Sequence, residues 1–389
     1  MHVGHYVYGL NEPGGVRGYV LAVAAAQRRR GLRVSLLDHA ERRETGAPSG
    51  EDVRFVAGPA DLEQAVRALG IDVIHAHGNL PLGLWDGPQG VPLVRTLHGH
   101  SPYCPSGSRF LARSGRPCPR SYSPLGCLWG HVVDRCGSVR PAKLAADYRQ
   151  RAAEAALLPG VPTMVVSAFL ERELVRAGYP PQGIHVLRLP AWDRPAEPPA
   201  PPPPGDATFL FLGRLVPAKG VSWLLRAFAA VPPPARLEVA GDGDLAARLA
   251  AEASALGLGA RVHFHGWVDG ARARVLLRRC RALVVPSVWH EPSGTVAVEA
   301  AAAGRAVIAS GVGGLPECVR QGETGLVVPP GDVGALADAM ARLAGDPSVA
   351  LSLGRAGWVR AGQAHDPDTH LDGLDGAYRL ARRPSGLAG

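Results

Sequence analysis

The sequence has only two lysines, Lys143 and Lys219, among 42 Lys and Arg residues in a chain of 389. Arginine therefore supplies nearly all of the positive charge, and each lysine suggests a specific role. Long apolar runs are also absent. None approaches the roughly 18 residues that a membrane-spanning helix needs, so we expect no such helix.

Aromatic residues make up only 6% of the chain, and no basic segment interleaved with aromatics matches a nucleic-acid-binding module. Nucleic acid is therefore not an expected partner. The first residues lack the charged start and long apolar centre of a signal peptide. We therefore expect a cytoplasmic protein.

The net charge of +8 is unevenly distributed. Residues 1–190 contain 22 Lys and Arg against 15 Asp and Glu, whereas the remainder is almost balanced. A basic first half favours an anionic partner, such as an acidic glycan, a lipid phosphate or the cytoplasmic face of a membrane. A solvated Arg-rich surface is the alternative.

Short apolar runs alternate with helical patterns in both halves of the chain, which predicts an α/β fold with parallel sheets. In the first half the expected helix at 19–30 lies between the first two of several strands, at residues 1–8, 32–38, 72–75, 93–97, 164–167 and 185–187. The second half restarts the same alternation from residue 207.

A Pro-rich linker at residues 192–206, WDRPAEPPAPPPPGD, is expected to be a semi-rigid spacer. It separates domain 1–191 from domain 207–366, two Rossmann-like, doubly wound domains that face a central cleft, where ligands commonly bind. Residues 384–389 are expected to be disordered.

The segment from Leu283 to Gly304 reads as strand, loop and helix, with Glu291 in the loop and Glu299 in the helix. A helix opened by Pro, Ser and Gly presents free N–H groups that attract an anion. The two carboxylates can accept hydrogen bonds from hydroxyls on either side of that anion. This pattern indicates a nucleotide sugar, although either acid alone can be an ordinary surface residue.

Two further loops of the second half are candidates for phosphate binding. In FLFLGRLVPAKG, Arg214 and Lys219 flank one loop and can neutralise a departing diphosphate without a metal. In AGDGD, the glycines Gly241 and Gly243 indicate a tight turn near the ligand. Asp242 and Asp244 leave a divalent-metal site open as the less favoured alternative.

Four histidines follow expected strands of the first half, where side chains point into the ligand crevice: His75, His77, His98 and His100. At least one is expected to contact a sugar. Gly14 and Gly15 follow the first strand, and a glycine pair there lets the backbone approach a phosphate or sugar. As a lone pair it is a weak signal.

Four of the six cysteines cluster in one basic segment: Cys104, Cys118, Cys127 and Cys136. Four thiolates can hold a structural zinc, with His131 as a substitute ligand, although the short CxxC spacing of common zinc sites is missing. Free thiols or disulfides are the alternatives, and a cytoplasmic location disfavours disulfides.

Several segments, in this order and spacing, resemble glycosyltransferase family 4, a retaining family with the GT-B fold that is also called glycosyl transferases group 1. They are GRLVPAKG, AGDGDL, HFHGWV, PSVWHEPSGTVAVEAAAAGRAVIAS and GGLPECVRQGETGLVVPPGD. The resemblance is most specific over residues 209–332 and weaker before residue 100. After His185 the sequence departs from the family pattern and reads LRLPAWD.

The resemblance implies roles for individual residues. The catalytic set would be His98, Arg214, Lys219 and Glu291. Donor-binding residues would be Gly15, Gly213, Gly241, Trp267, Val268, Ser293, Gly294, Thr295 and Glu299, with Glu299 on the ribose and Trp267 and Val268 near the base. A last helix at about 367–383 would cross back to the first domain.

The implied reaction is retaining transfer of a hexosyl unit from a nucleotide-diphosphate sugar to a glycan, lipid-linked or small-molecule acceptor, with no cofactor required. Protein catalysis would consist of positioning and charge stabilisation. A nucleotide-sugar epimerase and a non-catalytic nucleotide-sugar or glycan-binding protein remain alternatives. A phosphorylase with a lysine-bound pyridoxal cofactor is disfavoured by the scarcity of lysine.

Overall fold

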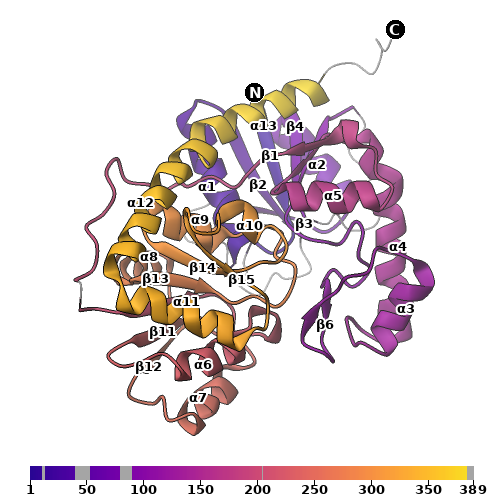
Figure 1. The fold of residues 1–389 in the computed structure, drawn as a ribbon. Coiled ribbons are helices and arrows are strands. Elements are labelled where there is room, and N and C mark those ends of the chain that lie inside the picture. Colours follow the sequence, from indigo (N-terminus) through magenta and orange to yellow (C-terminus); the bar gives the residue numbers. More distant parts are fainter. Residues whose placement is uncertain (11–13, 40–52, 79–89, 204, 383–389) are drawn as a thin grey trace.

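The structure is a computed structural model, which describes residues 1–10, 14–39, 53–78, 90–203 and 205–382. Two parallel sheets, each covered by helices, form two lobes (Figure 1). The expected α/β class with two Rossmann-like sheets is confirmed. The expectation of disorder at residues 384–389 lies outside the described residues.

The sheet of the first domain has seven strands in the order β3-β2-β1-β4-β5-β8-β9. All neighbours pair in parallel, and the central strands are buried because helices cover both faces. The strands are β1 (His2–Val7), β2 (Arg33–His39), β3 (Val53–Val56), β4 (Val73–His77), β5 (Leu93–Leu97), β8 (Thr163–Val165) and β9 (Ile184–Val186). The helices of this domain include α1 (Gly15–Arg29), α2 (Pro59–Leu69) and α5 (Ala168–Arg176).

The sheet of the second domain has six parallel strands in the order β12-β11-β10-β13-β14-β15. Its strands are β10 (Thr208–Leu212), β11 (Arg236–Ala240), β12 (Val262–Gly266), β13 (Ala282–Val285), β14 (Ala306–Ser310) and β15 (Gly325–Val328). Its helices are α6 (Val221–Ala229), α7 (Ala246–Ala255), α8 (Gly270–Arg279), α9 (Thr295–Ala302), α10 (Leu315–Cys318), α11 (Val333–Gly345) and α12 (Pro347–Ala364). Short 3₁₀ helices occur at Leu158–Gly160, Pro181–Gly183 and Pro217–Lys219.

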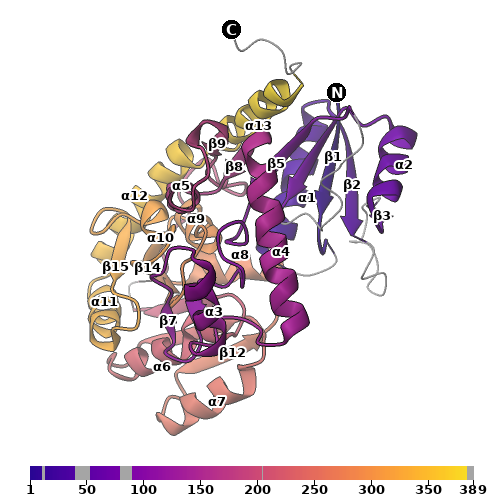
Figure 2. The same cartoon turned by 90° about the vertical axis from the view of Figure 1, so that its right-hand side faces the viewer.

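An excursion between β5 and β8 extends from the first domain toward the second (Figure 2). It contains the hairpin strands β6 (Phe110–Leu111) and β7 (Arg116–Pro117), and the helices α3 (Pro124–Val132) and α4 (Pro141–Leu157). Phe110 is buried in the core cluster of the second domain, to which Trp223 and Val288 also belong. The excursion therefore connects the two domains.

The last helix, α13 (Pro367–Ala381), crosses back over the first domain, as Figure 1 shows. Leu371, Leu374 and Tyr378 enter the first domain's core. The Pro-rich linker has no helix or strand among its described residues, but it is not a free spacer. The guanidinium carbon of Arg194 lies 3.7 Å from the ring centroid of Trp358 in α12. Arg305 donates a hydrogen bond to the Ala200 carbonyl at 2.7 Å.

Candidate functional site

The loop between β13 and α9 carries Glu291 at the domain interface. The Glu291 side chain is 7% exposed, and its Oε1 accepts a hydrogen bond from Lys219 Nζ at 2.6 Å. The Ser287 hydroxyl donates to the same oxygen. Because its carboxylate is already paired, Glu291 is held in place rather than presented as a free nucleophile.

Two helix N-termini meet across the cleft. The N-caps of α1 and α9 are Gly14 and Gly294, and neither cap contributes a side-chain hydrogen bond. No acidic residue occupies either first turn. Gly15 lies so close to α9 that a Cβ there would be 3.8 Å from Thr295 Oγ1. Together these ends present free N–H groups and two dipoles to one point, an arrangement suited to a phosphate.

A pocket of about 530 Å³ opens between these helices. Its walls include Gly15 and Tyr19 from the first domain and Val268, Thr295 and Glu299 from the second. The volume is in the range of small-molecule sites. The pocket thus brings together four residues that the sequence placed at the donor site, Gly15, Val268, Thr295 and Glu299, whereas Tyr19 was not among the predicted residues.

The pocket raises the pKa of Glu299 to about 7. The main cause is loss of hydration between the two domains, and the negative charge of Asp193 adds to it, whereas Arg274 acts in the opposite direction. The side chain is still open to the pocket. Asp193 and Arg274 line the pocket too, and sequence reasoning missed both because the linker and α8 gave no motif signal.

Other predicted donor residues lie outside this pocket. Arg214 is exposed, and Trp267 is 61% exposed. Gly241 is explained by packing, since a Cβ there would be 1.8 Å from the Gly213 carbonyl oxygen. Ser293 is buried at the start of α9. Their contacts with a donor stay predictions.

Of the four histidines expected in the crevice, only His98 is not fully buried, and none of the four lines the pocket. His98 is half-buried beside Tyr19, with ring centroids 4.9 Å apart, whereas His75 and His77 are buried beneath it. The expectation that strand-end histidines point into the crevice is wrong for these two, because the first-domain core and α13 enclose them.

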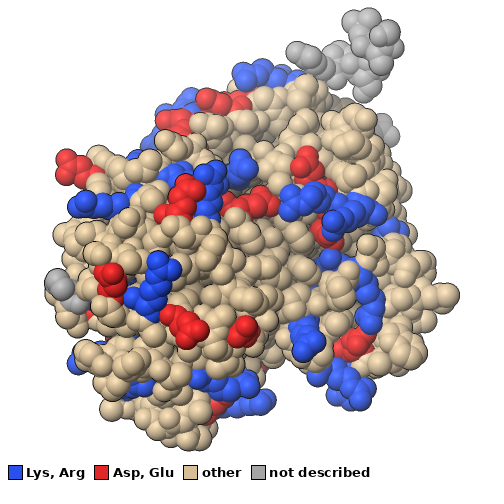
Figure 3. Space-filling model, in the orientation of Figure 1, with Lys and Arg blue, Asp and Glu red and all other residues tan. Residues whose placement is uncertain are grey.

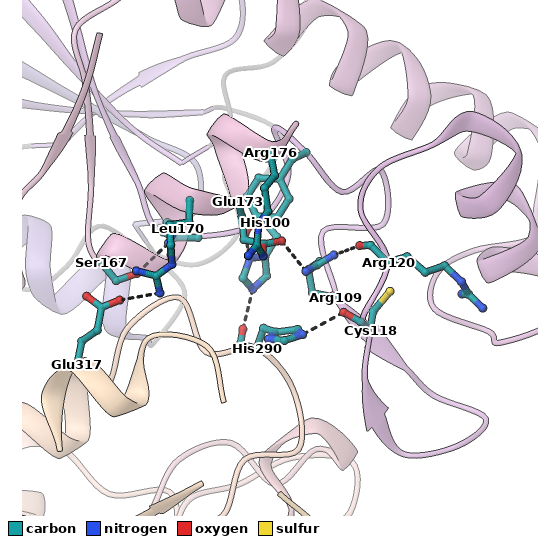
Figure 4. A network of polar contacts seen from close by, with 12 residues as sticks. His100, Arg109, Cys118, Arg120, Ser167, Leu170, Glu173, Arg176, His290 and Glu317 are labelled. Carbon is teal, nitrogen blue, oxygen red and sulfur yellow. Dashed lines mark hydrogen bonds and ion pairs between the residues drawn. The ribbon is translucent and has the colours of Figure 1, made fainter. Parts of the chain in front are cut away.

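His100 links the domains instead (Figure 4). Its Nε2 donates to the His290 carbonyl at 2.7 Å, and His290 Nε2 donates to the Cys118 carbonyl at 3.0 Å. The excursion thus holds the loop that carries Glu291.

A second set of interdomain contacts surrounds the N-terminus of α5, also drawn in Figure 4. The Glu317 carboxylate accepts the backbone N–H groups of Ala168 at 2.9 Å and Phe169 at 2.7 Å. Ser167 donates to the Pro292 carbonyl. The structure therefore has the two domains in contact around the site.

The four clustered cysteines line one small cavity of about 20 Å³, together with His131. All four are free thiols, and burial raises the pKa of Cys136 to about 11. Within the described parts of the chain, only His5, His75 and His77 have three ligand atoms within 4.8 Å of one another. The sulfurs are therefore not arranged as a preformed tetrahedral site.

Asp242 and Asp244 are exposed, and Asp242 accepts the N–H of Gly243 at 2.8 Å within the turn. Neither belongs to a group of three candidate ligands among the residues described. This geometry favours the tight turn over the metal site.

None of the helices in the described ranges is long and apolar enough to cross a membrane. Sequence profiles of two families match the chain. "Glycosyltransferase Family 4" matches residues 13–190, and "Glycosyl transferases group 1" matches residues 193–358.

Similar proteins include a phosphatidyl-myo-inositol mannosyltransferase of Mycobacterium leprae, 30% identical over 364 residues, which cover 86% of this chain and 85% of the relative. A glycogen synthase of Mycobacterium tuberculosis is 36% identical over 188 residues, 47% of this chain and 44% of that relative. The chain thus spans less than half the length of the latter. The solved structure of Anabaena HepE in complex with UDP and glucose superposes with a TM-score of 0.72 at 18% identity, covering 97% of this chain and 99% of that one. Both the family and the fold expected from the sequence are confirmed: the chain belongs to glycosyltransferase family 4 and has the GT-B fold.

Proposed function

We propose that this protein is a retaining hexosyltransferase that moves a sugar from a nucleotide-diphosphate sugar to an acceptor in glycan or glycoconjugate biosynthesis. The observation that carries the proposal is the interdomain pocket of about 530 Å³, where two uncapped helix N-termini lie next to Glu299. That combination accommodates an anion and hydroxyl groups side by side.

The donor fits the pocket in one direction. Its ribose hydroxyls would donate to Glu299, and its base would lie near Val268, which lines the pocket. The diphosphate would lie at the N-terminus of α9, within reach of Arg214 and Lys219. The UDP complex of the similar HepE fold supports a nucleotide in this class of cleft.

The reaction proceeds by attack of an acceptor hydroxyl on the anomeric carbon, on the face that the diphosphate leaves. A carbon–oxygen bond forms to the acceptor, the bond to the diphosphate breaks, and the departing phosphate oxygen takes the hydroxyl proton. Lys219 stabilises the charge that develops on the diphosphate. The Lys219–Glu291 contact keeps the ammonium in position before the donor arrives.

The function is tested by thermal shift with UDP-, GDP-, ADP- and TDP-sugars, followed by product analysis with the donor that stabilises the protein. A glycosylated acceptor with retained anomeric configuration supports the proposal. Sugar isomers formed without any acceptor would indicate an epimerase. Stabilisation without any product would indicate a binding protein.

The raised pKa of Glu299 gives a pH prediction. Ionised carboxylate accepts both ribose hydroxyls, whereas the protonated form has one oxygen that donates. Because the pKa is about 7, donor affinity should rise as the pH increases through neutrality and level off above it. One unit below the pKa the affinity should be about tenfold lower.

The measurement is titration calorimetry with an intact nucleotide sugar, because a free nucleotide carries a terminal phosphate that itself titrates near pH 6. Glu299→Gln is the matched control and should bind more weakly with a flat pH profile. An unchanged pH dependence in Glu299→Gln would remove Glu299 from the ribose site.

Acceptor binding is proposed on the basic excursion. A hollow of about 780 Å³ separates its hairpin from the second domain and is lined by Arg116, Arg226 and His290. Between Arg109 and Lys143 there are seven cations and one acid, Asp134, which pairs with Arg120 at 2.7 Å. Figure 3 shows Lys and Arg side chains on the excursion, at the lower right. An anionic glycan or lipid-linked acceptor suits this charge.

The exposed apolar face of helix α3 supports contact of the excursion with a membrane. Leu125, Leu128, Trp129 and Val132 are spaced as one helical face, and their exposures are 81%, 40%, 59% and 60%. An apolar face with neighbouring cations is the pattern of an interfacial helix on an anionic leaflet. We therefore propose peripheral attachment at this face.

The membrane prediction is tested by cosedimentation with phosphatidylserine-containing vesicles. Leu125→Ser with Trp129→Ser should lower binding at least about tenfold, since burial of such side chains contributes roughly 1.5–3 kcal/mol each. Val359→Ser on α12 is the control, because Val359 is 48% exposed but lies outside the excursion. Equal binding by both variants would contradict attachment through α3.

Structural zinc in the cysteine cavity stays a proposal, for which the four thiols around one cavity are the support. Bound zinc would draw the sulfurs together and order the excursion. Purified protein should then contain about one equivalent per chain, and Cys118→Ser should lose it. Metal analysis without zinc, with four titratable thiols, would refute it.

A further inference from the structure

The buried histidines beneath the cleft belong to a hydrogen-bond chain. His5, His75 and His77 have ligand atoms within 4.8 Å of one another, which by itself suits a metal. However, His5 already contacts His77 and Gln27, each at 2.8 Å. His75 contacts Tyr378 at 2.8 Å and Thr96 at 2.7 Å. With these ring nitrogens already paired, a network without metal explains the cluster.

Beside this network, a backbone carbonyl fixes the direction of one further pair of contacts. His370 Nδ1 lies 2.8 Å from the Arg188 carbonyl oxygen, which can only accept, so Nδ1 carries the proton. His370 Nε2 must then accept from the Tyr19 hydroxyl, 2.8 Å away.

The direction of the network itself is set by the Gln27 amide, whose nitrogen donates to the Tyr378 oxygen at 2.8 Å. The Tyr378 hydroxyl therefore donates to His75 Nδ1. His75 then carries its proton on Nε2 and donates to the Thr96 oxygen. The Gln27 amide oxygen lies toward His5.

The last steps lead to the cleft. Gln27 Oε1 accepts from His5 Nε2–H, so His5 Nδ1 accepts from His77 Nε2–H. His77 Nδ1 then accepts from His98 Nε2–H, at 3.4 Å. One proton on each imidazole satisfies every contact, and the remaining nitrogen of His98 is Nδ1. That atom is not among the buried polar atoms without a partner in the described structure.

We propose that this hydrogen-bond network fixes His98 as its Nε2–H tautomer. The unprotonated Nδ1 is then a hydrogen-bond acceptor for a sugar hydroxyl at the cleft. Gln27 is the positioning residue that carries the direction from α13 to His98. The inference rests on the proposed function for the identity of the hydroxyl, but not for the tautomer. It assigns His98 an accepting role and excludes a donating one.

This hydrogen-bond pattern requires each imidazole to be neutral, with one donor and one acceptor nitrogen. Burial lowers the pKa of His98 to about 3 and those of His5 and His370 to about 4. The same cause holds the pKa values of His75 and His77 well below their usual range. At neutral pH the five imidazoles are therefore all uncharged.

The direct test is nitrogen-15 NMR of the full chain labelled at histidine, with His98→Ala to assign the signal of His98. The expected result is the Nε2–H tautomer for His98, His77 and His5, and the Nδ1–H tautomer for His370. An Nδ1–H tautomer of His98 in the wild-type protein would overturn the proposal whatever the variants do.

Substitution of Gln27 tests the relay. Gln27→Met has a similar shape but no polar atoms, so His5 loses its acceptor and His98 should become a mixture of tautomers, with turnover about tenfold lower. Gln27→Glu is the matched control. Its carboxyl group accepts from His5 Nε2–H in either charge state, so the single tautomer of His98 should be retained.

The outcomes separate this inference from the proposed function. A single His98 tautomer in both variants would overturn the role of Gln27, even with low turnover. If the expected tautomers are found but no donor supports glycosyl transfer, the hydrogen-bond network is upheld and the proposed enzymatic function is refuted. With UDP-glucose as probe, weaker binding of UDP-glucose but not of UDP in Gln27→Met places the hydroxyl on the donor. Unchanged binding of both with lower turnover places it on the acceptor.

Discussion

Lys219→Ala is expected to lower kcat by on the order of 100-fold, the usual cost of removing a preorganised group that stabilises developing charge. Lys219 ends a short 3₁₀ helix, and the next residue, Gly220, has a φ of 71°. A Cβ at Gly220 would be 1.9 Å from the Pro286 carbonyl oxygen. This close packing fixes Lys219 beside Glu291, so its ammonium is in position before the diphosphate leaves.

The chain offers a matched control, because its only other lysine is on the surface. Lys143 pairs with Asp147 on α4, and its side chain is 63% exposed. Because Lys143 lies on the excursion and not at the donor pocket, Lys143→Ala should leave kcat unchanged at a saturating acceptor concentration. Near-normal turnover of Lys219→Ala with a nucleotide-sugar donor would show that the diphosphate is stabilised elsewhere.

The second domain could be predicted well because its strands and its site lie in consecutive segments. The apolar run before Pro286 and the alanine-rich pattern after Thr295 correspond to β13 and α9, and Glu299 lies in the pocket as expected. Local patterns also determine where a helix starts, but the expected helix at 19–30 begins earlier, at Gly15. The N-cap of this helix is Gly14, which has no side chain, so the sequence shows none of the Ser, Thr, Asp or Asn residues that usually mark a helix start.

The first domain's part of the site could not be predicted from local patterns, because distant residues complete it. Tyr19 meets His370, and Gln27 meets Tyr378, each pair 351 positions apart. Strand-end histidines normally reach the crevice, yet α13 encloses His75. Only the tertiary fold decides which of the four similar histidines stays partly exposed.

Removal of one partner from the buried Arg95–Glu154 pair should have the largest effect on stability. Both side chains are 0% exposed, and Arg95 also donates to the Gly78 carbonyl at 2.7 Å, just after His77. Glu154→Leu would remove the carboxylate that balances this buried guanidinium charge. We expect the free energy of unfolding of the first domain to fall by about 3–5 kcal/mol.

Hydrogen exchange of the β5 and β8 amides measures this loss in the domain that contains the pair. Arg95→Met combined with Glu154→Leu should lose less stability than Glu154→Leu alone, because the double variant buries no guanidinium that has lost its carboxylate. Glu63→Leu breaks the exposed Arg67–Glu63 pair, whose side chains are 78% and 41% exposed, and should cost at most about 1 kcal/mol. A Glu154→Leu effect no larger than that of Glu63→Leu would mean that water reaches Arg95, and the pair would then not hold α4 to the sheet beside His77.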